Sequence, residues 1–208
     1  MAYNVAFISL GCAKNQVNCE QMMAAAQAAG NTVQAGPEGA DVVVVNTCGF
    51  LASACEEAIE NILEACAYKQ QNPELKVIVT GCLAERYRSQ IEEEIPEVDA
   101  VVGCASNKAI DTIVARLFHG EDHLESYGAK KDFPLGGKRV IGTPAHYAYL
   151  KIAEGCNNRC HYCAIPGIRG PLHSRDLADC VAEARWLAGE GVKELIVVAQ
   201  DQIGRAHV

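Results

Sequence analysis

The stretch Asp41-Val42-Val43-Val44-Val45-Asn46, followed by Thr47-Cys48-Gly49, decides how this chain folds. Four consecutive valines are apolar on both faces of an extended strand, which is typical of a strand buried in a parallel sheet. Short apolar runs rich in β-branched residues predict further strands, at 3–10, 32–35, 75–80 and 98–102. Helical patterns alternate with these strands, at 16–29, 50–71, 84–94 and 107–119. The alternation predicts an α/β fold over residues 1–119, with a doubly wound and mostly parallel sheet.

A second series of strands and helices is expected after a linker. Residues 120–145 interrupt the alternation with Gly128, Pro134 and the pair Gly136-Gly137, and we expect them to form an interdomain linker with room for a short hairpin. A strand at 147–152, a helix at 175–190 and a strand at 193–200 follow. Because an eight-unit β/α barrel needs about 250 residues, residues 146–202 predict only the beginning of such a barrel.

Eleven cysteines among 208 residues are the most informative feature of the composition. The N-terminus carries no basic segment before an apolar run, so we expect no secretory signal and a cytoplasmic location, where structural disulfides are rare. Many thiols in such a compartment indicate metal or cluster chemistry. No apolar run reaches the ~18–20 residues that cross a bilayer, so we expect no membrane partner. The net charge of −8 argues against direct nucleic-acid binding by this chain.

Cys156, Cys160 and Cys163 form the spacing C-x3-C-x2-C in one predicted loop. Three thiolates with no fourth ligand suit a cubane iron–sulfur cluster that leaves one iron free for a substrate. The alternative is a zinc knuckle with His161 or His173 as a remote fourth ligand, although zinc pairs usually read C-x2-C.

A second set of cysteines follows the predicted strands. Cys12, Cys48 and Cys82 each lie just past the carboxyl end of a strand, which is the edge where open α/β sheets bind ligands. Adjacent strands are about 4.8 Å apart, so these thiols could share one cluster, whereas the simpler alternative is three buried structural thiols. Cys104 also follows a strand, and we interpret it as a thiol that lines the same edge without being a ligand.

Three arginines, Arg159, Arg169 and Arg175, lie around the C-x3-C-x2-C loop. They are interpreted either as solvated surface residues or as a binding site for an anionic group.

The C-x3-C-x2-C loop resembles that of the radical S-adenosylmethionine (SAM) enzymes. Together with Gly11-Cys12, Asn46-Thr47-Cys48-Gly49-Phe50 and Gly81-Cys82, it resembles the methylthiotransferase family of that superfamily. The stretches 9–18, 80–87, 151–160 and 164–172 are similar to the branch of the family that modifies a ribosomal protein. The resemblance covers nearly the whole chain and implies an N-terminal methylthiotransferase domain followed by the start of a radical SAM barrel.

The resemblance implies two 4Fe–4S clusters and SAM. One cluster would be held by Cys156, Cys160 and Cys163, with SAM on its free iron, and the other by Cys12, Cys48 and Cys82. An electron from a flavodoxin- or ferredoxin-like donor would split SAM, and the resulting 5′-deoxyadenosyl radical would take a hydrogen atom from the C–H bond at the β-carbon of an aspartate in small-subunit ribosomal protein twelve. That unactivated bond needs a cofactor of this kind. The second cluster would carry the sulfur to be inserted.

Two alternatives stay open at this point. A tRNA (N6-isopentenyladenosine) methylthiotransferase would share both clusters, and a non-catalytic iron–sulfur or zinc-binding module would share the cysteines alone. The resemblance also implies that the barrel and a further substrate-recognition domain continue beyond this chain, so we expect the chain by itself to be inactive. Residues 203–208 depart abruptly from the family pattern and read like a translated sequencing adapter, so we expect them to be a non-native tail.

Overall fold

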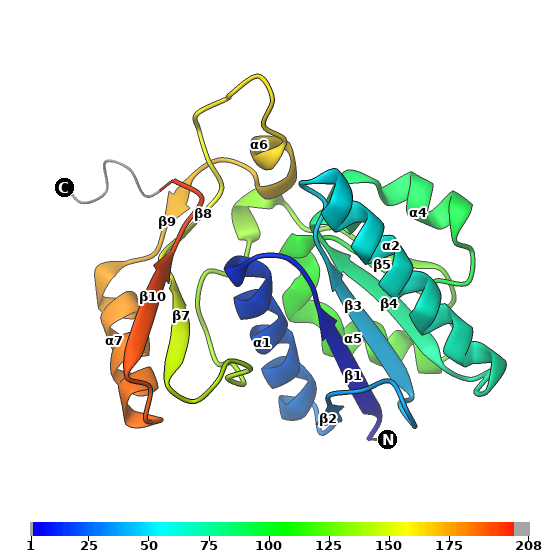
Figure 1. Ribbon diagram of the computed structural model, residues 1–208. Coiled ribbons are helices and arrows are strands. Elements are labelled where there is room, and N and C mark those ends of the chain that lie inside the picture. Colours follow the sequence, from blue (N-terminus) through cyan, green and yellow to red (C-terminus); the bar gives the residue numbers. More distant parts are fainter. Residues whose placement is uncertain (1, 202–208) are drawn as a thin grey trace.

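A computed structural model describes residues 2–201 of the chain, and the run of valines lies at the centre of its main sheet (Figure 1). Val42 to Val45 have no exposed surface and belong to β3 (Val42–Thr47), which pairs in parallel with a strand on each side. The sheet has six parallel strands in the order β2-β1-β3-β4-β5-β6. The other strands are β1 (Asn4–Ser9), β2 (Thr32–Gln34), β4 (Lys76–Gly81), β5 (Ala100–Val102) and β6 (Leu124–Ser126). The predicted parallel sheet is therefore confirmed.

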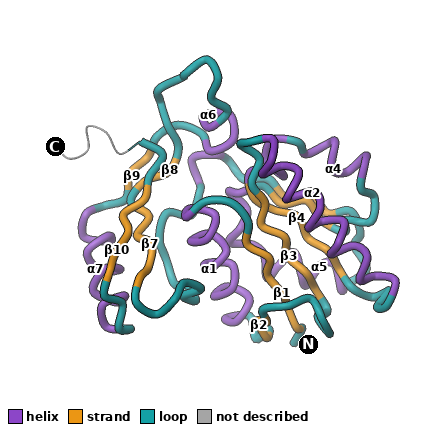
Figure 2. Tube along the Cα trace, viewed as in Figure 1, coloured by secondary structure: helices purple, strands orange, loops and turns teal. Residues whose placement is uncertain are grey.

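Helices cover both faces of this sheet. Val43 and Val45 face a core shared with α2 (Ala52–Ala67), α3 (Cys82–Arg86) and α4 (Arg88–Glu94). Val42 and Val44 face the opposite core, which is shared with α1 (Ala13–Ala28) and α5 (Ile110–Phe118). Because successive residues of a strand point to opposite faces, one valine run serves both cores. The fold is doubly wound, as predicted, and Figure 2 shows the two helical layers.

The helices begin closer to the strands than the sequence predicts. α1 starts at Ala13 rather than residue 16, and Cys12 is its extended N-terminal cap, with φ −93° and ψ 170°. The single helix expected at 84–94 starts at Cys82 and breaks at Tyr87, where φ is −124° and ψ is 33°. The helix expected at 107–119 begins with a 3₁₀ turn, Cys104–Ala109. As a consequence, Cys12, Cys82 and Cys104 lie where a helix begins, not within long loops.

The predicted linker 120–145 contains a sixth strand of the first sheet. β6 pairs in parallel with β5, so this part forms no hairpin, and only the residues after it connect the two units. The sequence Leu124-Glu125-Ser126 is too short and too polar to indicate a strand, and pairing with β5 produces it. The domain limits at 119 and 146 stay predictions.

The second unit is built on two parallel strands, β7 (Tyr147–Lys151) and β10 (Glu194–Val198), as predicted. α7 (Leu177–Gly189) packs on them through Leu187, which forms a small core with Ala148 of β7 and with Val192, between α7 and β10. A short antiparallel pair that was not predicted, β8 (Ala153–Glu154) and β9 (His173–Ser174), leads into the cysteine loop and out of it. α6 (Ile165–Arg169) follows the last cysteine of that loop. Residues 202–208, which include the predicted non-native tail, lie outside the described residues.

Among residues 2–201, no helix combines the length and the apolar character needed to cross a membrane.

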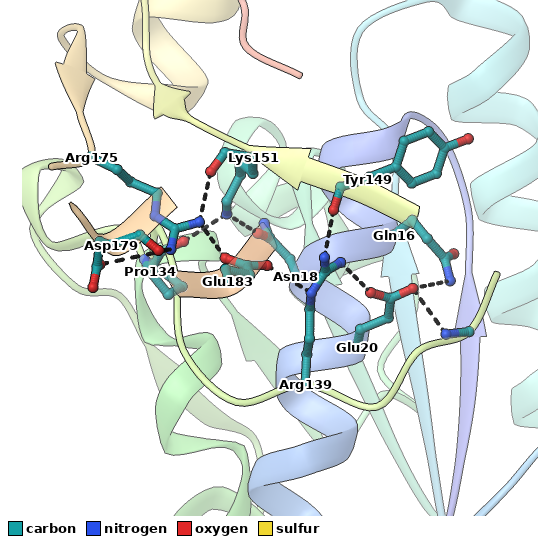
Figure 3. Close-up of polar contacts among 11 residues, drawn as sticks. Gln16, Asn18, Glu20, Pro134, Arg139, Tyr149, Lys151, Arg175, Asp179 and Glu183 are labelled. Atoms are coloured by element: carbon teal, nitrogen blue, oxygen red, sulfur yellow. Dashed lines mark hydrogen bonds and ion pairs between the residues drawn. The ribbon is translucent and has the colours of Figure 1, made fainter. Parts of the chain in front are cut away.

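Buried ion pairs fasten the second unit to α1 (Figure 3). The guanidinium of Arg139, in the connecting segment, lies 2.7 Å from the Glu20 carboxylate of α1 and 2.9 Å from the Glu183 carboxylate of α7. Its Nη2 donates to the Tyr149 carbonyl of β7 at 2.5 Å. Nearby, Lys151 Nζ donates to Asn18 Oδ1 of α1 at 2.6 Å. α1 therefore contacts the first sheet on one side and the second unit on the other.

We expect Glu20→Gln to lower the free energy of unfolding of the chain by about 2 kcal/mol, because the buried Arg139 guanidinium then keeps only one of its two carboxylate partners, Glu183. The Glu20 and Arg139 side chains are each 1% exposed. The matched control is Glu121→Gln, which removes an ion pair to Arg116 in which both side chains are more than 40% exposed. That change should cost much less, because solvent screens an exposed ion pair. Urea unfolding measures both, and equal losses would contradict the proposed difference.

Candidate functional site

The first three cysteines lie at one edge of the main sheet, on adjacent strands (Figure 1). Cys12 follows β1 and is exposed, Cys48 follows β3 and is half-buried, and Cys82 follows β4 and is 5% exposed. The strand order reverses between β1 and β3, and such a switch point is where doubly wound sheets bind ligands. The thiols thus lie where the strand pattern predicts them, around the place expected for a ligand.

Glycines allow these three strand ends to approach one another. A Cβ on Gly11, whose φ is +91°, would lie 2.7 Å from the Cβ of Cys48. A Cβ on Gly81, whose φ is +96°, would lie 2.6 Å from the backbone nitrogen of Thr47. Both positions combine a left-handed backbone with a close contact, which only glycine tolerates without strain.

The Asn15 side chain ties two of these strand ends together. Its Nδ2 donates to the Leu10 carbonyl at 3.1 Å and to the Thr47 carbonyl at 2.8 Å. In return, Asn46 Nδ2 donates to the Asn15 carbonyl at 2.8 Å. The residues next to Cys12 and Cys48 are therefore held by buried hydrogen bonds and not by packing alone.

Cys82 is the cysteine of this set whose thiolate the surroundings favour most clearly. A hydrogen bond from the Cys104 thiol lowers the pKa of Cys82 to about 5 against the effect of burial, and the Arg169 guanidinium adds to the lowering. Arg169 Nη2 lies 3.2 Å from Cys82 Sγ. The same contact with Cys82, and its own burial, raise the pKa of Cys104 well above its usual value. Cys104 lines the edge as a donor to Cys82, in keeping with a thiol that is not itself a ligand.

The second three cysteines lie on the loop between β8 and α6, at the top of Figure 1. Cys160 is exposed, while Cys156 and Cys163 are half-buried. The Cys156 N–H donates to the Gly170 carbonyl at 3.1 Å, and the Asn158 N–H donates to Cys156 Sγ at 3.5 Å. Backbone donors of this kind orient and tune sulfur ligands.

The donor chemistry of both sets fits a cubane cluster. Within residues 2–201, no three His, Cys, Asp or Glu side chains converge on a point that could hold one metal ion. The cysteines of a cubane each bind a different iron and do not need to converge in this way. A zinc knuckle requires convergence of four ligands, yet His161 is exposed on the loop and His173 lies in β9 with Nδ1 3.2 Å from the Pro171 carbonyl.

The arginines around the loop differ in their surroundings. Arg159 is exposed, with φ +44°. Arg175 pairs with Glu183 and donates to the Lys151 carbonyl at 3.0 Å, and its side chain is 3% exposed. Arg169 is 1% exposed. Arg169 and Arg175 are therefore not solvated surface residues. Their side chains are buried and form ion pairs with Glu154 and Glu183 of this chain.

A buried carboxylate, Glu154, gathers three cations between the two cysteine sets. Its Oε2 lies 3.0 Å from Arg169 Nη1 and 3.5 Å from Lys151 Nζ. Burial alone would raise the pKa of Glu154, but Arg169, Lys151 and Lys14 together hold it at about 2. Burial lowers the pKa of Lys151 to about 8 in spite of this carboxylate.

Four further residues belong to this site although the sequence did not predict their roles: Lys14, Asn15, Lys151 and Glu154. All four lie inside stretches that carry the family resemblance, 9–18 and 151–160. Polar residues within five positions of Cys12 or Cys156 were the available signal, but their burial follows only from the contact between the two units.

Comparison with known proteins agrees with this arrangement. Residues 4–121 match the model of the uncharacterized protein family UPF0004, and residues 150–207 match that of the radical SAM superfamily. The fold and the two cysteine sets thus define a radical SAM protein with an added N-terminal domain. Together with the relatives described next, they show that the chain belongs to the methylthiotransferase family of radical SAM enzymes.

Three relatives share the name ribosomal protein uS12 methylthiotransferase RimO. The protein of Caldicellulosiruptor saccharolyticus is 46% identical over 95% of this chain and 45% of its own length. That of Syntrophomonas wolfei is 45% identical over 98% of this chain and 46% of its own length. That of Acetivibrio thermocellus is 46% identical over 97% of this chain and 46% of its own length. The chain spans a little under half the length of these relatives.

We expect Gly81→Ala to lower the free energy of unfolding by about 3 kcal/mol, because a left-handed backbone and a clash with Thr47 add together. The matched control is Gly30→Ala, at φ +88° with no atom within 4 Å of the new Cβ. That change should cost only about 1–2 kcal/mol. Urea unfolding of both variants measures the difference, and equal costs would show that the close approach of β3 and β4 is not constraining.

Proposed function

We propose that the full-length protein inserts a methylthio group at the β-carbon of an aspartate in small-subunit ribosomal protein twelve. The proposal is supported by relatives named as uS12 methylthiotransferases, which match 95–98% of this chain over a little under half of their own length. The observation that carries it is that both cysteine sets lie at one end of the molecule, with the buried Arg169 between their loops. A radical formed at one set and a sulfur held at the other would then react within one complex, which avoids the entropy cost of a second encounter.

Each cysteine set would hold one 4Fe–4S cluster. Cys156, Cys160 and Cys163 would leave one iron free for SAM, and Cys12, Cys48 and Cys82 would hold the second cluster. When bound, these groups supply the electron that splits SAM and the sulfur that is transferred, with a flavodoxin- or ferredoxin-like protein as the electron donor.

The residues of the chain prepare both places. The Asn158 N–H orients Cys156 Sγ, and the exposure of Cys160 leaves the loop open to SAM. At the other set, the Cys104 thiol and then Arg169 lower the pKa of Cys82, which favours the thiolate, the form that binds iron. The left-handed glycines Gly11 and Gly81 leave room for a bulky inorganic group beside the strand ends.

We expect Cys156→Ala in the full-length enzyme to abolish SAM cleavage, and Cys48→Ala to preserve cleavage while reducing methylthiolation below detection. The matched control is Cys180→Ala, in α7 and outside both sets, which should keep both activities. The readouts are 5′-deoxyadenosine formation and mass spectrometry of the ribosomal protein and of tRNA. A Cys48→Ala enzyme that still methylthiolates would refute the role of the N-terminal set, and a modified tRNA in place of the protein would refute the substrate.

We expect anaerobic reconstitution of the full-length protein with iron and sulfide to load about eight irons per chain, four for each cubane. Replacing Cys12, Cys48 and Cys82 together by Ala should leave about four. Metal analysis of both proteins measures this. Stoichiometric zinc would instead support a non-catalytic metal-binding module, and iron that is unaffected by the triple replacement would contradict the assignment of Cys12, Cys48 and Cys82 as cluster ligands.

A further inference from the structure

The guanidinium of Arg169 lies between the two cysteine sets and contacts Glu154, beside the C-x3-C-x2-C loop, and Cys82 of the N-terminal set. It projects from α6, on the second unit, and is 1% exposed. Its Nη1 donates to Glu154 Oε2 at 3.0 Å, while its Nη2 donates to Asn15 Oδ1 of α1 and lies 3.2 Å from Cys82 Sγ. The Phe133 ring lies 5.8 Å away and helps to exclude water. Arg169 therefore contacts residues of both units, and one of its contacts is a sulfur atom of the N-terminal set.

The backbone next to Arg169 holds the other cysteine loop. The Gly170 carbonyl accepts the Cys156 N–H at 3.1 Å. Gly155, with φ +72°, packs so closely on this segment that a Cβ there would lie 2.6 Å from the Gly170 oxygen. A movement of residues 169–170 would thus shift Cys156 through the backbone and Cys82 through the side chain at the same time.

The contact with Cys82 goes beyond what neutralising Glu154 requires. Glu154 already has Lys151 as a second cation, 3.5 Å from its carboxylate. A hydrogen-bond donor and a positive charge beside a ligating sulfur favour the more negative, reduced form of an iron–sulfur cluster. Arg139 offers a comparison, since it is also buried between the units. Within residues 2–201 its ion pairs and hydrogen bonds are to Glu20, Glu183 and the Tyr149 carbonyl, and not to a cysteine.

We propose that Arg169 is a positioning residue that sets the distance between the two cysteine sets. We propose also that it raises the reduction potential of the cluster on Cys12, Cys48 and Cys82. The proposal rests on the proposed function for the identity of Cys82 as a ligand. In this proposal, Arg169 couples the position of the C-x3-C-x2-C loop to that of the N-terminal cysteine set.

The test uses the full-length protein with Cys156, Cys160 and Cys163 replaced by Ala, reconstituted with iron and sulfide, so that only the N-terminal cluster is present. Electron paramagnetic resonance then gives its midpoint potential in three variants. We expect Arg169→Gln to shift the potential to lower values, Arg169→Lys to shift it less because the charge remains, and Arg139→Gln to leave it unchanged. An unchanged potential in both Arg169 variants would overturn the proposal, as would an equal shift in Arg139→Gln.

Iron content separates this result from the proposed function. About four irons per chain in the background protein, as one cubane requires, show that the N-terminal set holds its cluster, and the potential then tests Arg169 alone. Absence of iron would instead refute the proposed function. If Arg169→Gln does not fold, Arg169→Lys against Arg139→Gln decides the outcome by the same criterion.

A second readout uses the enzyme with all six cysteines. If the distance between the two cysteine sets is no longer fixed, SAM cleavage should lead less often to methylthiolation. The ratio of 5′-deoxyadenosine to methylthiolated protein should therefore rise several-fold in Arg169→Gln and Arg169→Lys, but not in Arg139→Gln. A ratio equal to that of the unmodified enzyme in both Arg169 variants would contradict the positioning role.

Discussion

The arrangement of the two units depends on one buried carboxylate, that of Glu154, which has no exposed surface. An isolated carboxylate in such a place would cost several kcal/mol, and only partners with good geometry offset that cost. Arg169 and Lys151 provide them, and each also reaches α1, at Asn15 and at Asn18. Apolar contacts would permit small rotations of one unit against the other, whereas these directional bonds specify a single orientation.

α1 is the element that makes this possible, because both of its sides are buried. Cys19, Met22 and Ala26 pack on the main sheet, and Asn15, Asn18 and Glu20 bond to the second unit or to the strand ends. Cys12 caps the start of the same helix. One helix therefore carries a candidate ligand, part of the core and part of the contact between the units, so the position of Cys12 relative to the second unit depends on this helix.

The strands and the cysteine positions were predictable because their signals are local. Runs such as Val42 to Val45 indicate buried parallel strands, and parallel strands carry their following residues to one edge, which is why Cys12, Cys48 and Cys82 could be placed there. β6 could not be predicted, because pairing with β5 rather than its own sequence makes it a strand. The Arg169 contacts could not be predicted either. A buried arginine and a solvated one look alike in sequence. Of the partners that bury Arg169, Glu154 is 15 positions away, but Cys82 and Asn15 are 87 and 154 positions away.

The charges between the two cysteine sets explain why an acidic chain places cations in its interior. The chain has a net charge of −8, yet Lys14, Lys151 and Arg169 surround a single carboxylate, Glu154. Burial lowers the pKa of Lys14 to about 8, against the attraction of Glu154, Cys12 and Cys82. Such an excess of buried positive charge is costly unless anionic groups lie beside it. A thiolate at Cys82, whose Sγ lies 3.2 Å from Arg169 Nη2, is such a group, so the charges of this region are better balanced when Cys82 is ionised.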